Sequence, residues 1–214
     1  MSEEKAVTKG KSNGLGHRFI IDMIPRESTV LDLGCGDGEL LSLLAERKGV
    51  KGCGVEKNEQ AIYRCVASGL SVSNQDIDCG LTDYGDGSFD YVILNQVLQQ
   101  VIDMEKVLNE ALRVGHRVII GLPNFAYYRA RLQIFFRGRT PVTRSLPYMW
   151  YDTPNLHFLS LSDFTVYCRD KGLKIEKSVF LDGERQIRLW PNIFAQAGLF
   201  LLPGSQTQGA NKGG

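Results

Sequence analysis

Short apolar runs alternate with stretches of helical periodicity over about one hundred residues after position 25. In the helical stretches the apolar residues share one face, as at Leu40, Leu41, Leu43 and Leu44. Strands that alternate with helices in this way predict a parallel sheet covered by helices on both faces. The predicted parallel strands are 29–33, 51–56, a short strand that ends within 73–78, 88–96 and 117–122.

The two ends of the chain depart from this alternation. A helix around residues 15–24 stops at Pro25, before the first strand. After the fifth strand, a long segment at 123–157 precedes a helix at 161–171. Two final strands, 174–181 and 195–202, form a hairpin-like pair. We therefore predict an α/β fold with a Rossmann-like, doubly wound, mostly parallel seven-stranded sheet and an antiparallel edge strand.

Length and composition limit the possible domain organisation, binding partners and location of the protein. The 214 residues predict a single domain at 13–203 with an insertion at about 123–160, between polar tails at 1–12 and 204–214 that we expect to be disordered. The net charge of +1 gives no whole-molecule reason to bind nucleic acid or a membrane surface. Without a transmembrane-length apolar run or a signal region, we expect a cytoplasmic protein. The five cysteines lack C-x-x-C spacing, so neither a disulfide framework nor a metal site is predicted.

The first strand runs into a glycine-spaced turn, with glycine at 34, 36 and 38 and an acid, Asp32, before it. Glycine leaves no Cβ to block a ligand from the backbone, and the helix that follows offers free N–H groups. Asp32 either hydrogen-bonds its own turn or receives the amino group of a cofactor. Cys35 is either a small residue tolerated in the turn or a thiol activated by the helix N-terminus.

A second acid, Glu56, ends the second strand, where a carboxylate accepts ribose hydroxyls of a dinucleotide or of S-adenosylmethionine (SAM). The spacing G-x-G-x-G favours SAM over the dinucleotide pattern G-x-G-x-x-G. Asp76 or Asp78 at the third strand end is placed to contact adenine, with Ile77 beside the base, and Asn95 and Gln96 end the fourth strand. These four motifs, in this order, resemble those of class I SAM-dependent methyltransferases. The predicted site for SAM or S-adenosylhomocysteine comprises Asp32, Gly34, Cys35, Gly36, Glu56, Asp76, Ile77 and Asn95.

No catalytic residue is predicted. Methyl transfer to an activated sulfonium needs mainly proximity and alignment, so the absence of a nucleophile or a metal cluster does not argue against it. His157 is either a structural hydrogen-bonding residue or a base near the acceptor.

Arginine and aromatic residues are interleaved in a segment without acids, 123–151. Such a segment binds RNA or an acidic protein surface, or is simply a solvated face. The fourth strand lacks the Asn-Pro-Pro-aromatic pattern that holds a flipped base, so we expect no specific nucleic-acid binding.

Longer blocks of the chain resemble the methionine-biosynthesis family MetW. They include residues 30–40, 112–115, 121–125, 137–143, 146–157 and 189–192. The resemblance implies a SAM-binding, methyltransferase-like fold whose usual role is to pair with homoserine O-acyltransferase (MetX) and support its activity. It carries Asp32, Gly34, Gly36, Glu56 and Asp76 over as the SAM site, and it carries over no catalytic residue.

Two functions therefore remain open: a partner of the acyltransferase that uses SAM as a ligand, and an authentic small-molecule methyltransferase. Arginine and large aromatic side chains are enriched at the hot spots of protein interfaces. We accordingly predict that the partner contacts the segment 127–150, with Arg131 and Arg139 in the interface.

Overall fold

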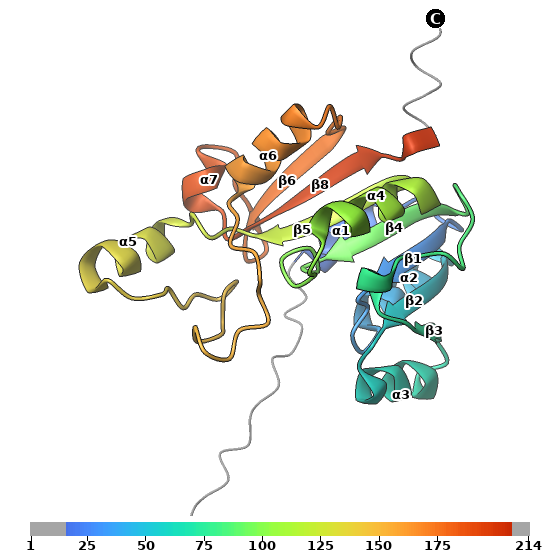
Figure 1. Cartoon of the computed structure of the whole chain (residues 1–214). Helices are drawn as coiled ribbons and strands as arrows, with labels where there is room; N and C mark the ends of the chain where they lie inside the picture. Colours follow the sequence, from blue (N-terminus) through green and yellow to red (C-terminus); the bar gives the residue numbers. More distant parts are fainter. Residues whose placement is uncertain (1–15, 207–214) are drawn as a thin grey trace, which may run out of the picture.

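The structure is a computed structural model, and it describes residues 16–206. Both predicted tails lie largely outside this range, since 1–12 and 207–214 are not described. Within it, a single sheet runs through the molecule in the order β3-β2-β1-β4-β5-β8-β6-β7 (Figure 1). The parallel half consists of β1 (Thr29–Leu33), β2 (Lys51–Glu56), β3 (Ser71–Asn74), β4 (Phe89–Asn95) and β5 (Gly115–Pro123).

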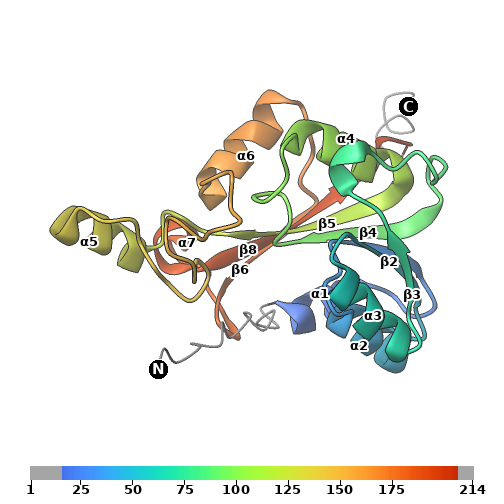
Figure 2. The ribbon, with the colours of Figure 1, turned by 60° about the horizontal axis from the view of Figure 1, so that its bottom comes forward.

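Helices cover both faces of this parallel half, as the alternation predicts. One face carries α1 (His17–Met23), α2 (Glu39–Lys48) and α3 (Glu59–Ala67), and the other carries α4 (Met104–Val114). On the face of α4, α6 (Leu161–Asp170) covers the antiparallel part of the sheet (Figure 2). Adjacent strand residues point to opposite faces of the sheet. Val30 belongs to the core cluster that includes residues of α1 and α2, whereas Leu31 belongs to the cluster that includes residues of α4 and α6. The period of two in the strands therefore divides the apolar residues into two layers.

The antiparallel side of the sheet is confirmed, with a finer arrangement than the sequence predicts. β8 (Ala197–Pro203) lies between β5 and β6 (Lys177–Asp182) and is antiparallel to both. The two-residue strand β7 (Arg185–Gln186) extends the sheet beyond β6, so the described chain has eight strands where we predicted seven. The short helix α7 (Pro191–Phe194) lies on the connection that returns the chain to β8.

The segment after β5 contains a helix that the sequence analysis did not predict. α5 (Tyr128–Arg137) extends away from the sheet, as both ribbon views show, and Ala130 is its buried residue (Figures 1 and 2). Gly138 ends it in the left-handed region at φ 56°. The chain then returns without regular secondary structure to Ser160, whose side chain caps α6 in a capping box with Asp163.

Candidate functional site

A cleft of about 650 Å³ opens at the carboxyl ends of the parallel strands. This edge is where open α/β sheets bind their ligands. All eight residues predicted for the cofactor line the cleft: Asp32, Gly34, Cys35, Gly36, Glu56, Asp76, Ile77 and Asn95. Side chains from 144–156, in the segment after α5, complete its wall.

The glycine turn forms the floor of the cleft and needs its glycines for different reasons. Gly34, Gly36 and Gly38 have φ angles of 71°, 58° and 78°, in the left-handed region. A Cβ on Gly34 would come within 2.8 Å of Val97, whereas a Cβ on Gly36 would meet nothing within 4 Å. Gly36 thus leaves open space for a ligand, and no side chain caps the N-terminus of α2 just beyond it.

Glu56 ties the end of β2 to this turn. Its Oε2 accepts the N–H of Gly36 at 2.9 Å, and its Oε1 accepts the N–H groups of Lys57 and Asn58 at 2.9 and 2.8 Å. An ionised carboxylate has about four acceptor positions, so the three bonds leave capacity for a ligand hydroxyl. The carboxylate therefore both shapes the turn and faces the cleft.

Asp32 is buried beneath the turn, with 4% of its surface exposed, and accepts no hydrogen bond from any described residue. Burial raises the pKa of Asp32 to about 7, and the negative charge of Glu56 adds to the rise. A buried carboxylate at the cleft with unfilled acceptor positions is suited to receive a cationic donor such as an ammonium group.

The third-strand acids differ from the prediction. We expected Asp76 or Asp78 to lie at the end of the third strand, but β3 ends at Asn74, and the residues Ile77–Cys79 form a 3-10 turn, η1. Asp76 caps this turn through the Asp78 N–H at 3.1 Å and pairs with Lys57 at 3.3 Å. Asp78 instead accepts the N–H of Ile102 at 2.9 Å. The chain forms an Asx turn where we expected the strand to end, because the Asp76 side chain accepts the Asp78 N–H in place of a neighbouring strand.

Cys35 behaves as a packed residue. Its sulfur lies against Gly54 of β2 and makes a long contact to the Gly36 carbonyl, at 3.9 Å. Burial, followed by the nearby Asp32 charge, raises the pKa of the Cys35 thiol far above its ordinary value. The structure therefore supports the small-residue interpretation, because a reactive cysteine needs its thiolate.

The far wall of the cleft contains polar residues that sequence reasoning did not identify. Gln99, Ser145 and Asn155 line it and are almost fully buried. The Gln99 carbonyl accepts the N–H groups of Leu156 and His157 at 2.8 and 3.1 Å, which joins the segment after α5 to the loop that follows β4. No local pattern reveals these residues, since the contact spans more than fifty positions of the chain.

The histidine near this wall has a structural role. His157 Nε2 lies 3.0 Å from the Val101 carbonyl oxygen and donates to it in the corresponding tautomer. His17, at the other side of the cleft, is buried, and burial lowers its pKa against the opposing charge of Glu39. Neither ring is an evident general base.

Arg131 and Arg139 lie apart from the cleft. The Arg131 Nε donates to the Ala126 carbonyl at the start of α5. Arg139 lines a separate groove of about 480 Å³ together with Arg137 and Trp150. The structure thus brings the eight cofactor residues together and separates them from the two residues predicted for the partner.

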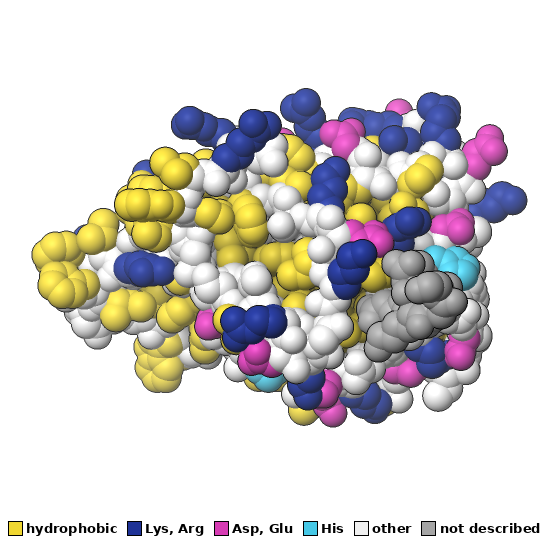
Figure 3. Space-filling model, turned by 90° about the horizontal axis from the view of Figure 1, so that it is seen from above, with side chains coloured by type: hydrophobic (Ala, Val, Ile, Leu, Met, Phe, Trp, Pro, Cys, Tyr) yellow, Lys and Arg dark blue, Asp and Glu magenta, His cyan; other side chains and the backbone are white. Residues whose placement is uncertain are grey.

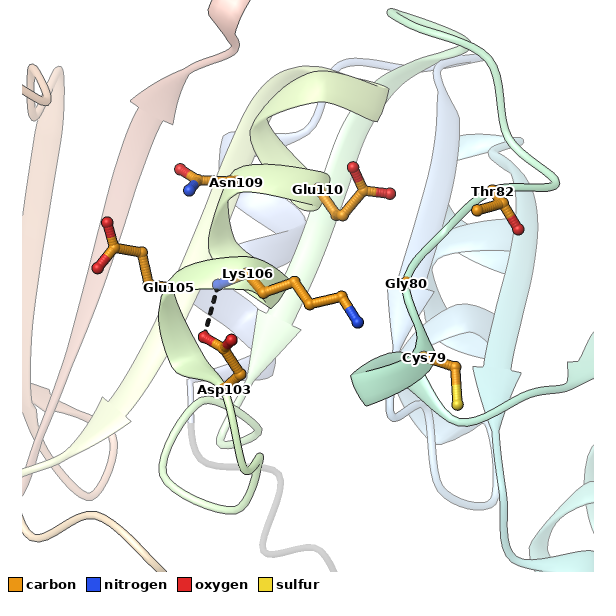
Figure 4. Close-up of a pocket in the computed structure, with 8 residues that line it drawn as sticks. All are labelled: Cys79, Gly80, Thr82, Asp103, Glu105, Lys106, Asn109 and Glu110. Carbon is orange, nitrogen blue, oxygen red and sulfur yellow. Dashed lines mark hydrogen bonds between the residues drawn. The ribbon is translucent and has the colours of Figure 1, made fainter.

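A second groove lies between η1 and α4, and polar residues that line it make structural contacts with the backbone (Figure 4). Asp103 caps α4 through the Lys106 N–H at 3.0 Å, and the Lys106 ammonium donates to the Asp78 carbonyl at 2.7 Å. Among residues 16–206, no group of three or more His, Cys, Asp or Glu side chains is arranged to hold a metal ion. In the same range, no helix is long and apolar enough to cross a membrane.

Several solved structures that share this architecture are SAM-dependent methyltransferases. One from Mesorhizobium loti aligns with a TM-score of 0.64 and 18% identity, covering 87% of this chain and 96% of that chain. One from Archaeoglobus fulgidus aligns with a TM-score of 0.62 and 19% identity, covering 87% of this chain and 90% of that chain. At these identities the similarity establishes the class I methyltransferase fold alone.

Sequence comparison is more specific. The bifunctional methionine biosynthesis protein MetXA/MetW of Rhodopirellula baltica is 36% identical over 182 residues, which cover 81% of this chain. The aligned part is 29% of that relative, so this chain spans less than a third of its length. The family model of the methionine biosynthesis protein MetW matches residues 15–202. The chain therefore belongs to the MetW family of methionine biosynthesis proteins.

Proposed function

We propose that this protein binds SAM or S-adenosylhomocysteine in the cleft and acts as a partner that supports homoserine O-acyltransferase (MetX). The observation that carries the cofactor proposal is the arrangement of Asp32 and Glu56 around an open Gly36. Two carboxylates with remaining acceptor capacity meet at a turn that leaves space for a ligand.

Each group in the cleft matches one part of the ligand. Glu56 would accept ribose hydroxyls, as acids at this strand end do in nucleoside-binding folds. Asp32 would pair with the α-ammonium group of the amino-acid moiety. Asp76 would accept the adenine amine with Ile77 against the ring, and Asn95 would lie beside the amino-acid moiety. The bound SAM would supply an activated methyl group, and the protein residues would orient it.

The partner role is supported by the fused relative and by the wall of the cleft. A MetX part and a MetW part share one chain in the Rhodopirellula protein, so the two functions are physically tied there. Three residues that line the cleft, Gln96, Gln99 and Asn155, carry neutral amide side chains, which cannot act as a general base. An authentic small-molecule methyltransferase is the second candidate, because methyl transfer to a good nucleophile needs alignment and no base.

The interface proposal includes Arg131 and Arg139, both in the segment after β5. Charged residues at an interface steer association and fix its register more than they add affinity. Their separation from the cofactor cleft would allow partner and cofactor to bind at the same time.

The test combines calorimetry with co-purification. Purified protein is titrated with SAM, S-adenosylhomocysteine and NAD, and mixed with the homoserine O-acyltransferase of the same organism before size-exclusion chromatography. Binding of SAM or S-adenosylhomocysteine, together with a co-eluting acyltransferase of raised activity, supports the proposal. Tight NAD binding without SAM binding would refute the assignment of SAM as the ligand. SAM binding without any complex would favour the methyltransferase.

A further inference from the structure

The segment after β5 exposes an unusual amount of aromatic surface. Phe135 and Phe136 of α5 are 80% and 74% exposed, and Trp150 and Tyr151 are 71% and 67% exposed. Leu132 lies one turn before the two phenylalanines on the same helix face and is also exposed. Figure 3 shows apolar side chains gathered at the end of the molecule where α5 projects. Exposed apolar side chains gathered in one region of a molecule mark an interaction surface, unlike apolar residues scattered singly.

Specific contacts hold the chain that returns from α5 against this helix. The Gln133 amide donates to the Val142 carbonyl at 2.9 Å and accepts the Val142 N–H at 3.1 Å, as a neighbouring strand would. This pair fixes the returning chain against α5. Trp150 then lines the same groove as Gln133 and Arg137. These contacts therefore fix Trp150 in the same region of the molecule as the exposed phenylalanines of α5.

The same segment also forms the wall of the cleft. Ser145, Tyr148 and Asn155 line the cleft, while Trp150 and Tyr151 between them face outward. Two further features mark the point where this wall meets the loop after β4. The Gln99 Oε1 is buried without a hydrogen-bond partner among the described residues, and Gln96 has a φ of 59°. Unsatisfied polar atoms and strained backbone are tolerated where a structure changes on binding.

We propose that the aromatic surface formed by Leu132, Phe135, Phe136, Trp150 and Tyr151 is where the acyltransferase docks, and that occupation of the cleft changes this docking through the segment 144–157. This inference rests on the proposed function, and it assigns the main contact to the aromatic side chains.

The charge of the segment and the fused relative indicate which occupant fits. Residues 123–151 carry five arginines and no acid, so a second copy of this chain would bring like charges together. A protein face with an apolar centre and an acidic rim is complementary. The MetXA part joined to the MetW part of the Rhodopirellula relative is a protein tethered to this domain. Aromatic anchors surrounded by arginine are the usual composition of a protein–protein hot spot.

The test measures the affinity of the full-length protein for the homoserine O-acyltransferase of the same organism. The double variant Phe135→Ser, Phe136→Ser should raise the Kd at least tenfold, and Trp150→Ala should raise it at least fivefold. The matched control is Tyr63→Ser, Val66→Ser on α3, whose side chains are 72% and 60% exposed on another part of the molecule. We expect the control to stay within twofold of the wild type. Unchanged thermal unfolding and S-adenosylhomocysteine binding would show that the variants are folded.

The coupling is measured with the same proteins. Saturating S-adenosylhomocysteine should change the Kd of the complex at least threefold, and the acyltransferase should change the Kd for S-adenosylhomocysteine by the same factor, as linkage requires. Equal affinities with and without the ligand would overturn the coupling. If the phenylalanine and tryptophan variants bind the acyltransferase as the wild type does, the aromatic surface is not its docking site. The same conclusion follows if these variants lose only their binding to phosphatidylglycerol vesicles. Absence of any wild-type complex would instead refute the partner role itself.

Discussion

The Oε2 of Glu56 accepts the backbone N–H of Gly36 at 2.9 Å, across a separation of 20 residues. This bond joins the end of β2 to the glycine turn after β1, so the carboxylate assigned to the ribose also determines the shape of the turn. The local order of this turn therefore depends on the Glu56 side chain, and under the proposed function cofactor binding depends on the same side chain.

Replacement of Glu56 by alanine should weaken S-adenosylhomocysteine binding by about 1–3 kcal/mol, because hydrogen bonds to a charged group are lost. Calorimetry measures this change. Glu59→Ala on the exposed start of α3 is the control and should bind as the wild type does. Wild-type affinity in the Glu56 variant would remove this residue from the site.

The raised pKa of Asp32 predicts pH-dependent ligand binding. The carboxyl is half charged at its pKa of about 7 and loses its charge as pH falls below this value, and pairing with the ligand ammonium requires the charged form. The Kd for S-adenosylhomocysteine should therefore rise as pH falls below 7, by up to about tenfold per pH unit. Titrations at pH 6, 7 and 8 measure the slope, which Asp32→Asn should flatten. His17 also lines the cleft, so a slope that disappears in His17→Gln would reassign the effect.

The same shift predicts a stability change of the ligand-free protein. Between the ordinary pKa of 3.8 and the folded value of about 7, the folded state binds more protons than the unfolded state. The free energy of unfolding therefore falls as pH rises through this window and stays lower above it. Asp32→Asn should stabilise the protein at pH 8, on the order of a few kcal/mol, and have little effect at pH 4. Thermal unfolding at both pH values measures this, and a variant less stable at pH 8 would contradict it.

Gly36 and Gly38 should respond differently to substitution by alanine, although both have positive φ. A Cβ on Gly36 enters open space, so Gly36→Ala should lose ligand affinity with a stability cost of about 1 kcal/mol from backbone strain. A Cβ on Gly38 would collide with Leu70 and crowd Cys65, so Gly38→Ala should cost more stability. Chemical denaturation and calorimetry separate the two effects. Equal stability of the two variants would contradict the close packing of Leu70 and Cys65 around Gly38.

The cofactor half could be predicted from sequence because its residues follow strands in order along the chain. The motifs at Asp32, Gly36, Glu56 and Asp76 each end a strand or begin a turn, and parallel strands bring such ends to one edge of the sheet. The third strand is the exception in this half. Asp76 caps a 3-10 turn where we expected the strand to end, and Asp78 accepts the N–H of Ile102.

The wall opposite the cofactor could not be predicted in the same way. Gln99 meets residues 156–157 through backbone carbonyl contacts, which leave no mark in side-chain patterning. The helix α5 was missed because its exposed aromatic face breaks the rule that apolar periodicity faces a core. The placement of β8 inside the antiparallel half depends on non-local pairing with β5, which strand propensity does not encode.

Arg139 and Arg131 should differ in their effect on the acyltransferase complex. Arg139 lines the groove beside Trp150, so Arg139→Glu should slow association and raise the Kd, more strongly at low salt. Arg131 is engaged by the Ala126 carbonyl at the start of α5, so Arg131→Glu should also lower the local stability of that helix. Surface association kinetics at two salt concentrations measure the first effect, and hydrogen exchange across 126–137 measures the second. S-adenosylhomocysteine binding is the control for both variants, because neither residue lines the cleft. An Arg139→Glu complex with wild-type kinetics at low salt would place the charged rim of the interface elsewhere.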